Sequence, residues 1–394
     1  MMRAKTKRQI VQTLKGLGIG VAIGLCFAGT LMAVPELRSF LNTLMDAHGF
    51  IIFMACWIGA MLICVAALFL QIIIHETGHL VCGLMTGFRM VSFRVANIIL
   101  VRHDDGWQFG RFSIAGTGGQ CLMEPAIDEI KNAHLMPYAW YLAGGVIANM
   151  VTAAVAIIIL CLHVAGVVMS CLLAMLTLTG IYLAITNGIP MKIGGVANDG
   201  DNIRTLKHDI DARRMLWIQL KANAVYTRGM RFCDMPQEWF DTPSDADAGN
   251  YLYATIIGMR ASREIEKLDF EAAYADLRRL RAAGSRLLEL LQMETACELL
   301  LPAIMLKRPR YEIEAIMDHK TEQYARTYAH YMLSRAVTVY VIERFLKRDK
   351  AATEKALQQV ERTAACYPTK GEQRSCRELM AYLKTLNDED YAIN

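Results

Sequence analysis

One long apolar segment limits what this chain can fold into more than any other feature. Across residues 50–86 the sequence is dominated by aliphatic and aromatic residues, and Glu76 is its only acidic or basic residue other than histidine. As one helix, this segment would be about 55 Å long at roughly 1.5 Å per residue, well beyond the roughly 30 Å hydrocarbon core of a bilayer. We therefore predict a membrane helix that either protrudes from the bilayer or is shielded by other parts of the protein.

A motif of polar side chains lies inside this apolar segment. His75-Glu76-Thr77-Gly78-His79 has the form H-E-x-x-H. Two imidazoles four residues apart lie on one helix face, which suits two ligands of a tetrahedral zinc ion, and the glutamate between them suits a general base. A chance match on a solvated helix is the simpler alternative. The apolar surroundings argue against it, because ionisable groups at membrane depth are costly and usually functional.

Other uncharged segments predict further membrane helices. Residues 16–35 follow a basic stretch and predict a first span; a signal peptide is the alternative, although no A-x-A-like cleavage site precedes Pro35. Residues 132–191 contain no Asp, Glu, Lys or Arg, and a turn at 163–166 divides them into spans at about 138–162 and 167–186. The sequence therefore predicts about four transmembrane helices.

The basic residues predict the orientation of these spans. They concentrate before the first span, between the second and third, and after the last, whereas the two other links hold only Arg38. Because Lys and Arg are enriched in cytoplasmic loops, we predict a multi-pass protein of the cell membrane with cytoplasmic N- and C-termini. The motif then lies towards the cytoplasmic half of the bilayer.

Composition excludes several other classes of function. Hydrophobic residues make up 54% of the chain, too many for an ordinary soluble enzyme, and a net charge of +4 indicates no nucleic-acid partner. The 11 cysteines are scattered without a C-x-x-C pair, which argues against a disulfide framework and against a cysteine-ligated metal.

Residues 88–120 differ from the apolar segments on either side of them. Residues 88–95 partly alternate between apolar and polar, and residues 98–101 and 109–114 flank an Asp-Asp-Gly turn at 104–106. This pattern predicts short strands with a hairpin. The glycine-rich stretch 116–119 lacks the Lys of a phosphate-binding loop, so we interpret it as a hinge or close-approach loop and not as a nucleotide site.

Residues 203–394 form a charged, helix-periodic region without another apolar run long enough to span a membrane. Lys267, Lys307 and Lys347 recur at 40-residue spacing, which suggests stacked hairpins of a tetratricopeptide-like array; a generic helical domain is the alternative. On the cytoplasmic side this domain could bind a substrate tail or a partner protein. The predicted helices cover about residues 203–228, 247–266, 270–283, 286–305, 311–318, 321–346, 350–364 and 372–385.

A catalytic zinc site needs a third protein ligand and an open position for water. Asp199 stands out because it follows the last span, after Pro and Gly residues that break the helix in the half of the membrane that holds the histidines. Asp199 could instead cap the next helix, and Asp201 is only two residues away. The acidic candidates are Asp104, Asp105, Glu124, Asp128, Glu129, Asp199 and Asp201.

Three motifs in this order resemble the site-2 protease family of intramembrane zinc metalloproteases over about residues 50–202. They are His75-Glu76-x-x-His79, Gly144-Gly145-x-x-x-Asn149 and Asn187-x-x-Pro190 with Asp199-Gly200. The resemblance implies that His75, His79 and Asp199 bind zinc, that Glu76 is the general base, and that Asn149 is a catalytic polar group near the scissile peptide. Interhelical packing is the alternative role for Asn149.

The resemblance also implies how a substrate binds. The strands within residues 88–116 would match the family's membrane-edge sheet, where an extended substrate adds a strand. We expect an edge strand within residues 88–101 to pair with a locally unwound substrate, which would compensate the backbone hydrogen bonds lost on unwinding.

The sequence thus predicts an all-α polytopic membrane protein with a small membrane-edge β-region and a helical cytoplasmic C-terminal domain, divided at about residues 1–49, 50–202 and 203–394. We expect a zinc-dependent endopeptidase in which Glu76 takes a proton from zinc-activated water to cleave a membrane-bound protein or peptide precursor. A membrane-tethered protease for soluble substrates is a variant. The alternative is a membrane scaffold or receptor with a structural metal site and a partner-recruiting helical domain, which would not need Glu76.

Overall fold

The computed structural model describes residues 24–112, 118–193, 196–243, 246–287, 289–389 and 391. The chain divides into two compact units. The first consists of residues 1–79 and 143–189, and the second of residues 80–142 and 190–394. The first unit is built from apolar helices, and the second combines a small sheet with many shorter helices.

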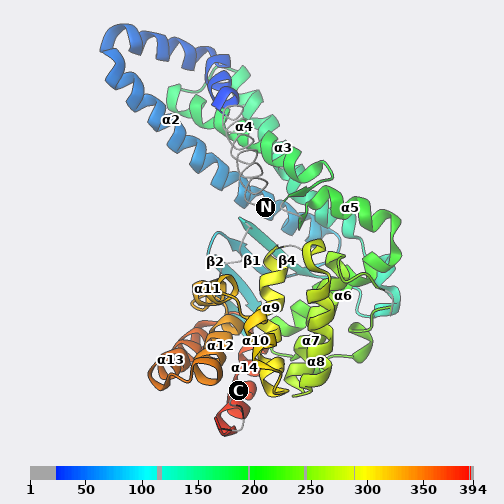
Figure 1. Ribbon diagram of the computed structural model, residues 1–394. Coiled ribbons are helices and arrows are strands. Elements are labelled where there is room, and N and C mark those ends of the chain that lie inside the picture. The colour runs from blue at the N-terminus through cyan, green and yellow to red at the C-terminus, as the bar shows by residue number, and fades with distance from the viewer. Residues whose placement is uncertain are drawn as a thin grey trace. The chain divides into compact units, whose positions relative to one another are not determined.

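The first unit contains α2 (Pro35–Met85, as far as His79), α4 (Val167–Gly188), most of α3 (Tyr138–Cys161) and the short helix Gly24–Ala33 (Figure 1). Among the residues described, Ile51–Met85, α3 and α4 are the three helices long and apolar enough to cross a membrane. They confirm that the predicted segments 50–86, 138–162 and 167–186 form long apolar helices. The predicted first span, residues 16–35, begins outside the described residues.

The link between the first and second predicted spans is helical. Pro35 is the first residue of α2, which continues for 51 residues through the predicted link. Proline is tolerated in the first turn because its missing N–H would have no intrahelical partner there. The negative charge of Glu36 also stabilises the N-terminal end of the helix, where the helix dipole is positive. The carboxylate of Glu36 also lies 2.5 Å from Nδ1 of His163, in the connection between α3 and α4. The link is therefore an ordered part of the first unit.

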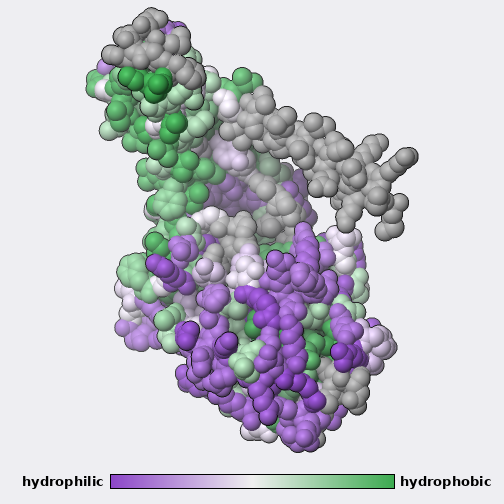
Figure 2. All heavy atoms as spheres, turned by 60° about the vertical axis from the view of Figure 1, so that its left-hand side comes forward, coloured by the Kyte–Doolittle hydropathy of each residue, from purple (hydrophilic) through white to green (hydrophobic). Residues whose placement is uncertain are grey.

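Small and medium-sized apolar residues fill the core of the first unit. Ala67, Ala156 and Ala174 are almost completely buried, and such small residues allow close approach of membrane helices. Large apolar side chains on the outer faces are exposed, among them Ile51 at 82% and Leu62 at 66%. Figure 2 shows hydrophobic residues in green along the long helices and hydrophilic residues in purple over the helical domain. Lipid tails suit the first kind of surface and water the second.

The second unit begins with a four-stranded antiparallel sheet of order β3-β2-β1-β4. Strands β1 (Arg89–Val95), β2 (Ile98–His103) and β3 (Gly106–Arg111) confirm the predicted strands and their hairpin. Strand β4 (Gly119–Glu124) was not predicted, and part of the expected loop at 116–119 lies outside the described residues. Because β4 pairs with the outer side of β1, the expectation of an edge strand within residues 88–101 is wrong; β3 and β4 are the edges.

Helices make up the rest of the second unit, and most lie where the sequence predicts them. The predicted helix 203–228 is divided at Asp209, whose carboxylate accepts the backbone N–H of Ala212 and so begins a new helix. The predicted helix 321–346 is also divided. The helices are α5 (Asp199–His208), α6 (Ile210–Arg228), α7 (Tyr251–Glu266), α8 (Phe270–Ala282), α9 (Glu289–Met305), α10 (Arg310–Ile316), α11 (His319–Tyr328), α12 (Leu333–Val341), α13 (Lys350–Cys366) and α14 (Lys370–Thr385).

Neighbouring helices of this domain pack in sequence, as α7 does with α8, α8 with α9, and α12 with α13. A short hairpin of β5 (Lys192–Ile193) and β6 (Val196–Ala197) precedes α5. The helical content of the domain is confirmed, and its tetratricopeptide-like arrangement stays a prediction.

Candidate metal centre

The last turns of α2 hold the H-E-x-x-H motif in a buried position. His75, Glu76 and His79 are only 8%, 8% and 7% exposed. The helix brings the two imidazoles edge to face, with ring centroids 4.7 Å apart and Nε2 atoms 3.1 Å apart. Two nitrogens bound to one tetrahedral zinc at about 2.0 Å would lie about 3.3 Å apart. The spacing of the pair therefore fits two ligands of one zinc ion.

Asn149 of α3 determines which nitrogen of His75 carries the proton. The amide Nδ2 of Asn149 donates to the backbone oxygen of Gln71 at 2.9 Å and to Gln71 Oε1 at 2.7 Å. Both amide protons are thus used, so Asn149 Oδ1 must face His75 Nδ1, which lies 2.7 Å away and donates to it. His75 Nε2 then keeps its lone pair, the form that binds a metal.

Gln71 is a residue of the candidate site that the sequence prediction missed. It is completely buried, and its Nε2 donates to the backbone oxygen of Leu176 in α4 at 2.9 Å. One chain of hydrogen bonds therefore joins α2, α3 and α4 to His75. A signal was present, because Gln71, His75 and His79 recur at every fourth residue and form a polar stripe on one face of an apolar helix. A search for metal-ligand residue types passes over an amide.

Close packing of α2 against α3 requires glycine at two positions. A Cβ atom at Gly145 would lie 2.5–2.6 Å from ring atoms of His75. A Cβ atom at Gly78, inside the motif, would meet the backbone of Gly144 and the side chain of Ala148. Both approaches are far closer than van der Waals contact, so a side chain at either position would displace the imidazole or the neighbouring helix. The small residues of α3 therefore allow the ring of His75 to sit between the helices.

Replacing Gln71 with Leu is expected to lower zinc affinity by about tenfold or more, because Asn149 would lose one of the partners that orient it. The loss of stability should be small, since interhelical hydrogen bonds in membranes contribute on average about 0.6 kcal/mol. Zinc affinity measured by competition with a chelator is therefore the readout. Thr177→Val is the matched control, because Thr177 of α4 donates only within its own helix, to Leu173 at 2.9 Å. Equal zinc affinities in the two variants would contradict an orienting role for Gln71.

Asp199 and Asp201, the two neighbouring candidates for a third ligand, lie in the first turn of α5. Asn198 caps this helix, and its side-chain oxygen accepts the N–H of Asp201 at 2.9 Å. The capping role considered for Asp199 therefore belongs to Asn198. Asp201 is 2% exposed, and its carboxylate pairs with Arg204 at 2.6 Å. Both the backbone and the side chain of Asp201 thus serve the start of the helix.

The other acidic candidates for which ion pairs are described pair with cations of the second unit. Glu124 is buried and contacts Lys221 at 2.8 Å and Arg228 at 2.7 Å, both on α6. Burial alone would raise the pKa of Glu124, but the hydrogen bonds from Arg228 and Lys221 outweigh burial and leave the pKa lowered. These carboxylates therefore hold structure together. The remaining pairs are Asp105–Lys370, Asp128–Lys221 and Glu129–Lys131.

Comparison with protein families places these motifs in a known group. The family model described as Peptidase family M50 matches residues 63–366, which is most of the chain. Comparison with curated proteins finds no match, and comparison with solved structures finds none either. The matched region includes the motif at His75–His79, the second motif at Asn149 and Asp199. The chain belongs to peptidase family M50, the site-2 protease family.

Proposed function

We propose that this chain is a zinc-dependent intramembrane endopeptidase that cleaves a membrane-bound protein or peptide precursor in or near its membrane-spanning segment. Membership of peptidase family M50 indicates a metallopeptidase, and the apolar helices indicate a membrane protein. One observation carries the proposal: His75 donates through Nδ1 to Asn149, so its Nε2 faces the Nε2 of His79, beside the buried Glu76.

The available donor atoms suit zinc. His75 and His79 each offer an imidazole nitrogen, and Asp199 offers a carboxylate oxygen. Two imidazoles and one carboxylate form a common ligand set of catalytic zinc in metallopeptidases. We propose Asp199 as the third ligand in preference to Asp201, because the carboxylate of Asp201 already pairs with Arg204. When bound, zinc would make a water molecule nucleophilic at neutral pH and polarise the scissile carbonyl.

We assign the role of general base to Glu76. Its carboxylate accepts a proton from the attacking water, whose oxygen forms a bond to the carbonyl carbon of the scissile peptide. Glu76 then delivers that proton to the amide nitrogen as the C–N bond breaks, which gives a carboxylic acid and an amine; the acid's proton then passes to the amine, so the products are a carboxylate and an ammonium group. The buried position of Glu76 keeps bulk water from competing for the proton.

Asn149 acts on the reaction through His75. Both protons of its amide go to Gln71, and its oxygen accepts from His75. These contacts support a positioning role, in which Asn149 orients a metal ligand, and they leave no amide proton for the scissile peptide. The expected catalytic contribution of Asn149 is therefore indirect. The same hydrogen bonds hold the helices together and orient His75.

Strand β3 is the sheet edge that we propose for substrate binding. It lies at one edge of the sheet, whereas α6 packs against β4 at the other edge. Trp107 and Phe109 of β3 are 56% and 76% exposed, which gives this edge an apolar surface. An unwound substrate segment could add a strand here and recover backbone hydrogen bonds. We also propose that both termini, and hence the helical domain, lie in the cytoplasm, as the distribution of Lys and Arg predicts.

Metal content tests this function directly. Gently purified full-length chain is expected to contain about one zinc per chain, and chelation should abolish cleavage until zinc is restored. Less than about half a zinc per chain would count against an enzyme of this class. Family membership does not favour the scaffold or receptor alternative. The intact Glu76 also argues against it, because a structural metal site needs no base and is normally closed by a fourth protein ligand.

A further inference from the structure

The second unit contains a cavity of about 980 Å³. Residues of α3, α5, α6, α7, α8, α9, α12 and α14 line it, together with residues of β1, β2 and β4. It reaches the surface, because Tyr251 and Leu268 in its lining are 38% and 40% exposed. Ligand pockets in proteins typically measure about 300–1,000 Å³. This cavity is therefore large enough for several side chains of a peptide and much larger than a metal ion or a simple amine requires.

The lining of the cavity is acidic. Among the described lining residues, Arg231 is the only lysine or arginine. Arg335 is not part of the lining and is completely buried. Arg335 pairs with Glu298 and lies 3.3 Å from Glu294. Arg231 pairs with Glu378, and among the ion pairs of the described residues none includes Glu266 or Glu372. The glutamates that line the cavity are Glu266, Glu294, Glu298, Glu372 and Glu378.

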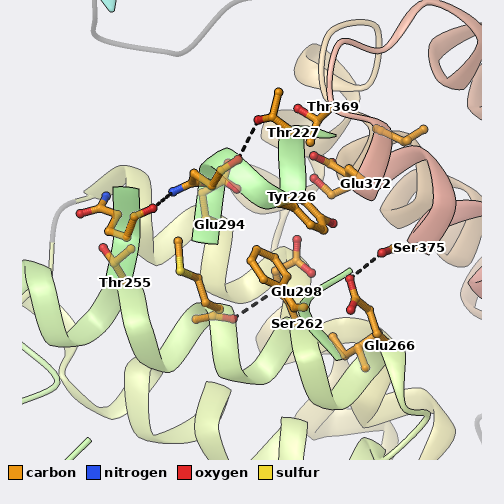
Figure 3. A pocket seen from close by; sticks show the side chains of 18 of the residues that line it. Tyr226, Thr227, Thr255, Ser262, Glu266, Glu294, Glu298, Thr369, Glu372 and Ser375 are labelled. Atoms are coloured by element: carbon orange, nitrogen blue, oxygen red, sulfur yellow. Dashed lines mark hydrogen bonds between the residues drawn. The ribbon is translucent and has the colours of Figure 1, made fainter. Parts of the chain in front are cut away.

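Several of these carboxylates face the cavity from deep within the domain. Figure 3 shows Glu298 of α9 and Glu372 of α14 on either side of Tyr226. Glu298 is surrounded by protein, yet 32% of its side-chain surface is accessible, because it faces the cavity. Glu266 accepts hydrogen bonds from Ser375 and from the N–H of Cys233. Burial raises the pKa of Glu266 and of Glu372, because it disfavours their charged forms, and a cation that enters the cavity would offset this cost.

We propose that this cavity binds a segment rich in lysine or arginine from the cytoplasmic flank of the membrane-bound substrate. The inference rests on the proposed function, because that function requires a substrate with a membrane helix. Flanks on the cytoplasmic side of membrane helices are enriched in Lys and Arg. The lining also supplies apolar surface for the methylene stems of these side chains, for example at Leu220, Leu280 and Leu301. The acidic residues and the apolar surface of the lining therefore both match a basic peptide.

Two variants of the cavity test the proposal without relying on cleavage. Glu372→Gln removes a negative charge, and Gly258→Phe fills space, because a Cβ atom at Gly258 of α7 would meet no atom within 4 Å. Their matched controls are Glu354→Gln, on the exposed surface of α13, and Gly258→Ala. Each is made in the full-length chain carrying Glu76→Gln, purified in detergent. The probe is a fluorescent peptide of about ten residues with several lysines, and its counterpart has every lysine acetylated.

We expect the lysine peptide to bind and the acetylated peptide to bind at least about tenfold more weakly, as for the loss of a charge-assisted contact. Glu372→Gln and Gly258→Phe should each weaken binding by a similar factor, and the two controls should not. Equal binding in Gly258→Phe and Gly258→Ala, or equal binding of the two peptides, would overturn the proposal. If the lysine peptide binds but the unchanged chain, with Glu76 in place, cleaves no membrane-bound substrate, the cavity site stands and the proposed function is contradicted. If the unchanged chain cleaves its substrate but the lysine peptide does not bind, the proposed function stands and the cavity site is contradicted.

Peptide binding should also strengthen as the pH rises through neutrality. Burial raises the pKa of Glu372 to about 7. Below that pH the carboxyl group is neutral and attracts no cation, whereas above it the carboxylate does, so affinity at about pH 8 should exceed affinity at about pH 6. Glu372→Gln should flatten this dependence. The titratable or charged groups around Glu372 are Tyr226, Glu298, Arg335, Tyr367 and Cys376.

Discussion

Changing Glu76 to Gln is expected to lower peptide cleavage by about 10²–10⁴-fold while zinc stays bound. The amide keeps the size of the carboxylate and takes no part in holding the metal, but it cannot accept the proton of the attacking water. Cleavage can be followed on the membrane protein that this inactive chain captures by crosslinking in native membranes. Zinc content of the purified variant, measured by mass spectrometry, should match that of the unchanged chain.

Glu36→Gln is the matched control for this experiment, because Glu36 lies on the same helix and contacts His163 at its far end. Its cleavage rate should stay within about twofold of the unchanged chain, since it lies outside the proposed machinery. Full activity in Glu76→Gln would refute the proposed role of the carboxylate. Loss of zinc from that variant would show that Glu76 is a ligand and not a base.

Replacing Asp199 with Ala is expected to weaken zinc binding by more than about 100-fold. That figure is the upper end of the effect of removing a residue that only supports a ligand, so a larger loss identifies direct coordination. Zinc affinity would be measured by titration against a chelator of known strength. Cleavage should fall in parallel, because the loss of one ligand empties the site at physiological zinc levels.

Asp201→Ala provides the comparison, two residues along the same helix turn. It should destabilise the start of α5, where Asp201 pairs with Arg204, and change zinc affinity by much less than Asp199→Ala. Arg204→Ala removes the same ion pair from the other side and should resemble Asp201→Ala. If Asp201→Ala loses zinc and Asp199→Ala does not, the two aspartates have the opposite roles to those assigned here.

The membrane helices and the motif could be predicted because their signals are local. Long uncharged runs define the spans, and the spacing of His75 and His79 is a property of one helix turn. The β2–β3 hairpin was predicted for the same reason, since Asp105-Gly106 is a turn sequence. Local signals therefore located the candidate ligands and the base before any tertiary contact was known.

The elements that were missed depend on distant partners. Strand β4 begins at Gly119 and is a strand because it pairs with β1, some thirty residues earlier. Gln71 gains its role only from Asn149 and Leu176, 78 and 105 residues away. The acidic cavity is likewise assembled from helices and strands that are far apart in the sequence. The division of the predicted helix 203–228 at Asp209 is different, because an aspartate that caps a helix is a local signal. It was missed because hydrophobic periodicity alone does not reveal a capping residue.

The hydrogen-bond chain from Leu176 through Gln71 and Asn149 to His75 has a consequence for transferring this chemistry to another scaffold. A helix grafted with the H-E-x-x-H sequence alone would carry the histidines but not the amide that selects the tautomer of His75. The smallest unit that fixes the tautomer of His75 therefore runs from Gln71 to Leu176 of the apolar helices, and Asp199, the third ligand that we propose, would have to be supplied with it. The H-E-x-x-H motif therefore shows where the site lies, and a design would also have to reproduce the three helices that orient His75.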